Sequence, residues 1–184
     1  MCIRDSLDTM NCCLFDVGSV LRGGFEMGNV WYNEPKTLDT AFDVMGDIIL
    51  STAAQQYGGF TVPEVDKILS PYAQKSYNKY YEEFLKYSDP SWEGREEKGR
   101  VYAWEKVCRD CDQGWQGIEY KLNTVGSSRG DYPFVTVTLG LGTGRFEKMI
   151  SKSLLKVHMG GQGKAGHKKP VSYTHLTLPT ILRV

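Results

Sequence analysis

The sequence lacks an excess of charge of either sign, and it lacks long apolar runs. Lysine and arginine together number 22, aspartate and glutamate also number 22, and the formal net charge is zero. A balanced charge gives no electrostatic reason to bind nucleic acid or an anionic membrane surface. No apolar run reaches the roughly 18 residues that a membrane-spanning helix needs. The sequence therefore predicts neither a nucleic-acid partner nor a membrane location.

The N-terminus also lacks the basic region and apolar stretch of a secretory signal. The chain has five cysteines, and without a signal these are expected to be thiols in a reducing compartment, which predicts a cytoplasmic protein. Cys108 and Cys111 form a C-x-x-C pair, but a structural zinc site needs about four ligands and no second pair exists. Both fall on the apolar face of an expected helix, so core packing is favoured and no metal site is predicted.

The two ends of the chain differ in character from the middle. Residues 1–6, "MCIRDS", and residues 172–184, "SYTHLTLPTILRV", resemble translated sequencing-adapter sequence. We expect both to be artefacts, which leaves 7–171 as the segment that carries the fold and makes that segment part of a longer protein.

Helical patterns occupy most of that segment. The "NEPK" motif at 33–36 predicts the start of a helix that runs to about Tyr57, with Pro35 in its first turn. Thr61 is expected to cap a short helix over 62–69, and Ser70-Pro71 a second one that runs to about Tyr87. After a loop at 88–94, a long helix is expected to continue to about Val125. Its apolar stripe has helical spacing and consists of Val101, Trp104, Cys108, Cys111, Trp115, Ile118, Leu122 and Val125.

Two β-rich runs, 10–16 and 133–140, predict strands, and an amphipathic helix is expected from about Arg145 to Val157. Two short strands do not make a stable sheet alone. The sequence therefore predicts a helix-rich α/β protein whose strands belong to a larger sheet.

Chemical candidates are few when judged from the residues alone. Cys12 and Cys13 are adjacent on an expected strand, so they should point to opposite faces, and a buried inert thiol is the favoured interpretation. The glycine loop Gly140-Leu-Gly-Thr-Gly144 lies between a strand and a helix, where a plain turn is favoured over a phosphate contact. The glycine- and lysine-rich run 160–169 is read as a solvated connector rather than a nucleotide grip. Glu34 and Lys36, at the expected helix start, are read as capping and surface charge rather than ligand contacts.

Three separated blocks carry a resemblance to a known family. "MNCCLFDVGSVLRGGFEMGNVWYNEPKTLDTAFDVMGDI", "QYGGFTVPEVDKILSPY" and "NTVGSSRGDYPFVTVTLGLGTG" resemble the anaerobic, class III ribonucleoside-triphosphate reductases, in the family's order. The resemblance covers nearly all of 8–171. It implies that the chain is a helix-rich partial segment of the family's ten-stranded α/β barrel.

The resemblance also implies a chemistry. The family reduces ribonucleoside triphosphates to deoxyribonucleotides through a glycyl radical, which generates a thiyl radical on a central cysteine, with formate as reductant in well-known members. A second cysteine, on the first barrel strand, serves the 2′ side of the ribose. We assign this role to Cys12 rather than Cys13, because Cys12 stands two residues before Leu14 and strand alternation puts the two on one face.

By the same resemblance, Glu34 and Lys36 are candidates for binding the ATP or dNTP effector, and the candidates for the substrate side are Ser127, Ser128, Gly140, Gly142 and Gly144. The expected partners are a radical-SAM activating enzyme and a second copy in a homodimer. The thiyl cysteine, the glycyl-radical segment and the zinc site of the family are not found in the segment, so the chain alone is expected to be inactive. The alternative is a catalytically silent nucleotide- or partner-binding module with the same fold.

Overall fold

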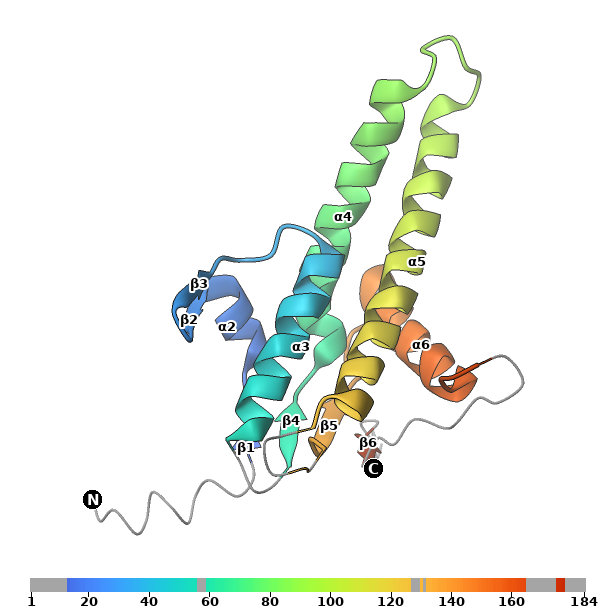
Figure 1. Ribbon diagram of the computed structural model, residues 1–184. Coiled ribbons are helices and arrows are strands. Elements are labelled where there is room, and N and C mark those ends of the chain that lie inside the picture. Colours follow the sequence, from blue (N-terminus) through green and yellow to red (C-terminus); the bar gives the residue numbers. More distant parts are fainter. Residues whose placement is uncertain (1–12, 56–58, 127–129, 131, 165–174, 178–184) are drawn as a thin grey trace, which may run out of the picture.

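The computed structural model describes residues 13–55, 59–126, 130, 132–164 and 175–177 (Figure 1). The helices are α2 (Val17–Gly23), α3 (Leu38–Ala54), α4 (Val65–Tyr87), α5 (Arg95–Thr124) and α6 (Arg145–Gly160). The strands are β1 (Cys13–Leu14), β2 (Phe25–Met27), β3 (Val30–Tyr32), β4 (Phe60–Val62), β5 (Val135–Thr138) and β6 (His175–Thr177). In this part of the chain, no helix combines the length and the apolar character that a membrane crossing requires.

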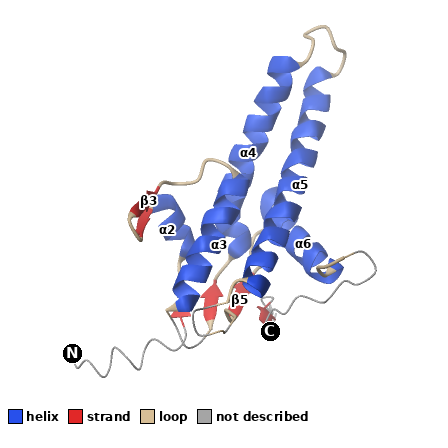
Figure 2. Cartoon of the chain, viewed as in Figure 1, coloured by secondary structure: helices blue, strands red, loops and turns tan. Residues whose placement is uncertain are grey.

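A four-stranded parallel sheet lies at one end of a group of long helices (Figure 2). The strand order is β1-β4-β5-β6, and β2 and β3 form a separate antiparallel hairpin. Parallel neighbours need long crossovers, which the helices between the strands provide. The prediction of a helix-rich α/β fold is confirmed. The sequence-based reading found β1 and β5 but missed β4, β6 and the hairpin.

Helix α3 has a continuous apolar face. Its buried side chains pack into the main core and include Leu38, Phe42, Val44, Met45, Ile48 and Ile49. The predicted start was wrong, since the helix begins at Leu38 and the "NEPK" residues precede it. A serine from another helix explains the difference. The Oγ of Ser76 on α4 accepts a hydrogen bond from the Leu38 N–H at 2.8 Å and so supplies the cap that the local sequence does not.

Helix α4 is a single helix of 23 residues, and the prediction of two shorter helices was wrong. Thr61 lies in β4 rather than at a helix cap. Pro71 is inside the helix and exposed, and it leaves the carbonyl of Lys67, also exposed, without its usual partner. Lys67 lies on the exposed side of the helix, where water can bind this carbonyl, and the helix continues.

Helix α5 confirms the long predicted helix, and it confirms the centre of the apolar stripe. Cys111, Trp115, Ile118 and Leu122 are buried, whereas the ends of the stripe are open, with Val101 50% and Val125 46% exposed. Figure 1 shows why the N-terminal end is open, because there α5 pairs with α4 as a hairpin that extends beyond α3. Cys108 packs against the core beside the fully buried Cys111, so the prediction of core packing for this pair is confirmed.

Candidate functional site

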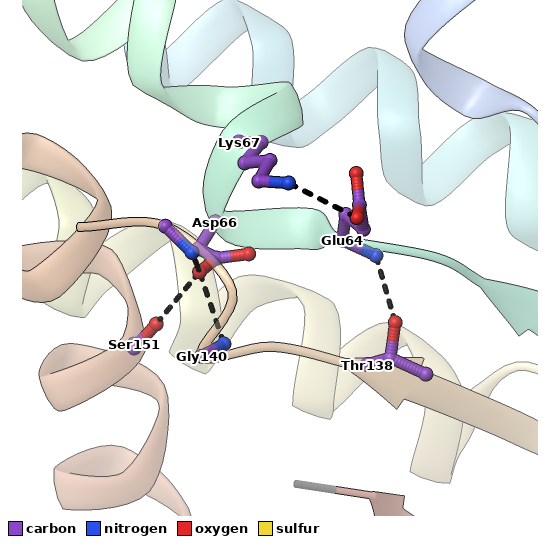
Figure 3. A network of polar contacts seen from close by, with 7 residues as sticks. Glu64, Asp66, Lys67, Thr138, Gly140 and Ser151 are labelled. Atoms are coloured by element: carbon purple, nitrogen blue, oxygen red, sulfur yellow. Dashed lines mark hydrogen bonds and ion pairs between the residues drawn. The ribbon is translucent and has the colours of Figure 1, made fainter. Parts of the chain in front are cut away.

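Two loops meet at the carboxyl edge of the sheet. Strand β4 is followed by Pro63, Glu64 and the first turn of α4, and β5 is followed by the loop 139–144 and α6. Since the strands are parallel, their carboxyl ends share one edge, and open parallel α/β sheets bind ligands there. Figure 3 shows the polar contacts that join the two loops.

Asp66, in the first turn of α4, is the centre of these contacts. Its side chain is fully buried. Its Oδ2 accepts hydrogen bonds from the backbone N–H groups of Gly140 and Gly142, each at 3.0 Å, and lies 3.5 Å from the Oγ of Ser151. Its Oδ1 is also buried and has no hydrogen-bond partner within the described part of the chain.

A second carboxylate, that of Glu147 on α6, lies under the same loop. Its Oε1 accepts a hydrogen bond from the Oγ of Ser70 on α4 at 2.9 Å. A Cβ on Gly142 or on Gly144 would overlap with the Glu147 side chain. Gly140 has a φ of +94°, a conformation that residues with a side chain rarely adopt. The glycines are therefore needed for close approach to the carboxylates and for the turn itself.

The loop after β4 is fixed to the end of β5 by a backbone contact. The N–H of Glu64 donates to the Oγ1 of Thr138 at 2.8 Å. Glu64 is the one non-glycine residue with positive φ in the described ranges, at 46°. Such conformations are uncommon and persist where the surroundings hold them. The Glu64 carboxylate pairs with Lys67 at 3.1 Å, on the half-exposed side of the loop.

The two faces of the sheet have different surroundings. Cys13 is in register with Phe60, and Phe60 with Val135, and all three pack with the helical core. Leu14, the next residue along β1, lies opposite Thr61 and is 73% exposed. Among the described residues, one face of the sheet is thus covered by helices and the other, at Leu14, is open.

The effector candidates lie elsewhere. Glu34 precedes α3 and pairs with Lys75 of α4 at 2.7 Å, and Lys36 is exposed. Lys75 is nine residues along α4 from Asp66, about 14 Å at the helical rise. The structure therefore brings Gly140, Gly142 and Gly144 together at the carboxyl edge and does not bring Glu34 to that edge. Three other candidates, Cys12, Ser127 and Ser128, lie outside the described residues.

The reading of the sequence missed Asp66, Glu147 and Thr138. A signal for Asp66 was present, because the helix dipole favours an acidic residue in the first turn of a helix, and ligand sites of parallel sheets lie where the strands end. The sequence predicted a helix capped at Thr61, whereas Thr61 lies in β4, so Asp66 was not placed at the edge of the sheet. Nothing in the local sequence pairs Glu147 with Ser70, since 77 residues separate them.

No group of three or more histidine, cysteine, aspartate or glutamate side chains in the described ranges is arranged to hold a metal ion. The thiols of α5 are poor ligands and nucleophiles in any case. Burial raises the pKa of Cys111 to about 12, and burial also raises the pKa of Cys108. A thiol with a raised pKa stays protonated and inert near neutral pH.

The sheet, its crossover helices and its carboxyl edge define a helix-rich α/β segment with a parallel sheet. The crystal structure of the anaerobic ribonucleotide reductase from Thermotoga maritima, in complex with dATP and CTP, matches 79% of this chain and 23% of its own, with a TM-score of 0.52 and 11% identity. At this identity the match shows the fold alone.

The sequence comparisons define the family. The family model for anaerobic ribonucleoside-triphosphate reductase matches residues 4–180. The reductase of Enterobacteria phage T4 is 39% identical over 161 residues, which are 88% of this chain and 26% of that protein. The Haemophilus influenzae enzyme is 38% identical over 88% of the chain and 22% of its own length, and the Escherichia coli enzyme 36% over 84% and 21%. The chain belongs to the anaerobic ribonucleoside-triphosphate reductase family, and it spans about a quarter of the length of these curated relatives.

Proposed function

We propose that this chain forms part of the catalytic barrel of an enzyme that reduces ribonucleoside triphosphates to 2′-deoxyribonucleoside triphosphates. The observation that carries the proposal is the family match over nearly the whole chain. Formate is the proposed reductant. Its oxidation to carbon dioxide supplies the two electrons, and the 2′-hydroxyl leaves as water after taking up a proton.

The proposed contribution of this chain is the thiol of Cys12. Cys13 packs against the helical core, and Leu14 faces the open side of the sheet. Successive side chains of an extended strand alternate between faces, so alternation assigns Cys12 to the side of Leu14. On that side the thiol would donate hydrogen at the 2′ position of a ribose in the barrel. Such a thiol must be protonated, and an apolar neighbour such as Leu14 favours the neutral form.

The remaining parts of the proposed reaction come from outside this chain. The glycyl radical, the thiyl cysteine, the zinc site and the radical-SAM activating enzyme are assigned to the rest of the reductase and its partner. The cysteines of the sequence are Cys2, Cys12, Cys13, Cys108 and Cys111, and the last two are committed to the core. We therefore propose that the 184-residue chain by itself makes no deoxynucleotide.

Effector control is proposed to involve the region before α3. Glu34 and Lys36 carry side chains that are open to solvent there. A nucleotide at this position would contact both the charged side chains and the start of α3. We propose a homodimer, in which the second copy would complete the effector site.

The experiment compares Cys12→Ala with Cys13→Ala in the full-length reductase that carries this segment. We expect Cys12→Ala to abolish deoxynucleotide formation while the glycyl radical, measured by electron paramagnetic resonance, still forms. Cys13→Ala is the matched control, because its side chain packs against the core, and it should retain most of the activity. Near-normal deoxynucleotide formation by Cys12→Ala would overturn the assignment.

A further inference from the structure

We infer that Asp66 is a positioning residue of the reductase, which holds the glycine loop 139–144 at the carboxyl edge of the sheet in the place where it lines the substrate side. The inference rests on the proposed function for the role of that loop. It rests on the structure alone for the contact between Asp66 and the loop. Asp66 belongs to a different strand–helix unit from the loop, so it couples two units of the barrel.

The contact is specific in its geometry. One carboxylate oxygen, Oδ2, accepts two backbone N–H groups, from Gly140 and Gly142, at 3.0 Å each. Hydrogen bonds to a charged acceptor are roughly twice as strong as neutral ones. Two such bonds from alternate residues fix both the place and the orientation of the intervening peptide groups. The side chain of Ser151, at 3.5 Å from the same oxygen, adds a weaker contact from α6.

Asp66 is fully buried, so its carboxylate interacts with protein groups rather than with water. A fully buried carboxylate is costly unless hydrogen bonds compensate it. Its position in the first turn of α4 lowers that cost, because the helix N-terminus favours a negative charge. The buried Oδ1 has no partner among the described residues, so it can still accept a hydrogen bond.

The loop is shaped to be held in this way. Gly142 lies so close to Asp66 that a Cβ added to it would be 3.0 Å from Oδ2, and it would also overlap with Glu147. Glu147 is itself fixed by the Ser70 hydroxyl on α4, one turn after Asp66. As Figure 3 shows, Asp66 reaches the loop from α4 while Thr138, at the end of β5, holds the turn before α4. The loop is therefore held by hydrogen bonds to Asp66 and packed closely against the Glu147 side chain.

Loss of this contact should affect catalysis by misplacing the loop rather than by removing a reacting group. A displacement of about 1 Å can reduce a rate by about 100-fold when a group positions a substrate. We expect Asp66→Ala in the full-length reductase to raise the KM for the ribonucleoside triphosphate at least about tenfold, with the glycyl radical content unchanged. Asp66→Asn keeps one oxygen that can accept the two N–H groups, so it should restore much of the loss. Glu83→Gln, at an exposed position farther along α4, is the matched control and should leave KM unchanged.

A second measurement separates the contact from the function. In the full-length reductase, hydrogen exchange of the Gly140 and Gly142 amides should accelerate about 10- to 100-fold in Asp66→Ala, while amides in the centre of α3 keep their protection. Unchanged exchange of the two glycine amides would overturn the contact itself, whatever the function. Accelerated exchange with an unchanged KM would overturn the positioning role. A normal activity of Cys12→Ala would instead count against the proposed function, and the result on the contact would stand. If Asp66→Ala does not fold, Asp66→Ser takes its place in both measurements, with the same outcomes expected, because a serine hydroxyl is too short to reach both N–H groups.

Discussion

The ring of Phe42 on α3 occupies the space that a Cβ on Gly114 of α5 would need. The same ring meets Trp115 edge-on, with the ring centroids 5.0 Å apart. Since glycine has no side chain, the backbone of α5 can approach α3 closely at this point. The glycine in the middle of a 30-residue helix is therefore a packing requirement.

Gly114→Ala should lower the free energy of unfolding by about 1–3 kcal/mol, because the added methyl group forces a buried aromatic ring to move. The matched control is Gly117→Ala on the same helix, where a Cβ would meet no atom within 4 Å. This control should gain roughly 0.5–1 kcal/mol, since alanine is the better helix former. Urea unfolding measures the free energy of unfolding of both variants. A Gly114→Ala variant as stable as Gly117→Ala would contradict the packing requirement at Gly114.

Ser76→Ala should also destabilise the fold. The Oγ of Ser76 is the acceptor for the buried N–H of Leu38 at 2.8 Å, and alanine would leave that N–H unsatisfied at a cost of about 1–3 kcal/mol. Gln74→Ala, at an exposed position on the same helix, should change the stability by less than about 0.5 kcal/mol. Thermal or urea unfolding measures both. Equal stability of the two variants would mean that the start of α3 does not depend on Ser76.

The contacts of Phe42 with Gly114 and of Ser76 with Leu38 show which parts of the fold can be predicted from the sequence and which cannot. The apolar face of α5 follows from spacing alone, and the strand at β5 from its alternating valines and threonines. The start of α3 did not follow, because its cap comes from Ser76, 38 residues away. Glycine is a poor helix former, and only the position of Phe42 explains Gly114 in the middle of α5.

The same holds for the candidate site. The glycine loop was recognised from its sequence, and so was the alternation that separates Cys13 from Leu14. Asp66 was not, because Pro63 and Pro71 look like helix starts and hid the short strand β4 in front of it. The contact of Asp66 with Gly140 spans 74 residues and depends on two parallel strands lying side by side.

A pH dependence follows from Glu119, which is fully buried on α5. Burial raises the pKa of its carboxyl to about 7, although a hydrogen bond from Gln162 acts in the opposite direction. A carboxyl whose pKa is higher in the folded state stabilises the fold below its unfolded pKa and loses that effect as the pH rises through the folded value. Relative to Glu119→Gln, the wild type should therefore lose up to roughly 3 kcal/mol of stability between about pH 4.5 and pH 8.

Urea unfolding of both proteins across this range tests the sign. The imidazole Nδ1 of His158 lies 3.6 Å from the Glu119 carboxylate, and a protonated His158 would oppose the effect by favouring the ionised carboxyl. A wild type that gains stability over Glu119→Gln as the pH rises would contradict the prediction and would show that the two side chains act as an ion pair.

The central claim is that the segment supplies the strand cysteine of a reductase active site, and protection of that thiol by substrate tests it most directly. The full-length reductase would be alkylated under anaerobic conditions with and without a ribonucleoside triphosphate, and each cysteine followed by mass spectrometry. We predict that the nucleotide slows the modification of Cys12 at least about tenfold and leaves Cys13 and Cys108 unchanged, because only Cys12 is assigned to the open face of the sheet. Modification of Cys12 at the same rate with and without a saturating nucleotide would contradict the claim.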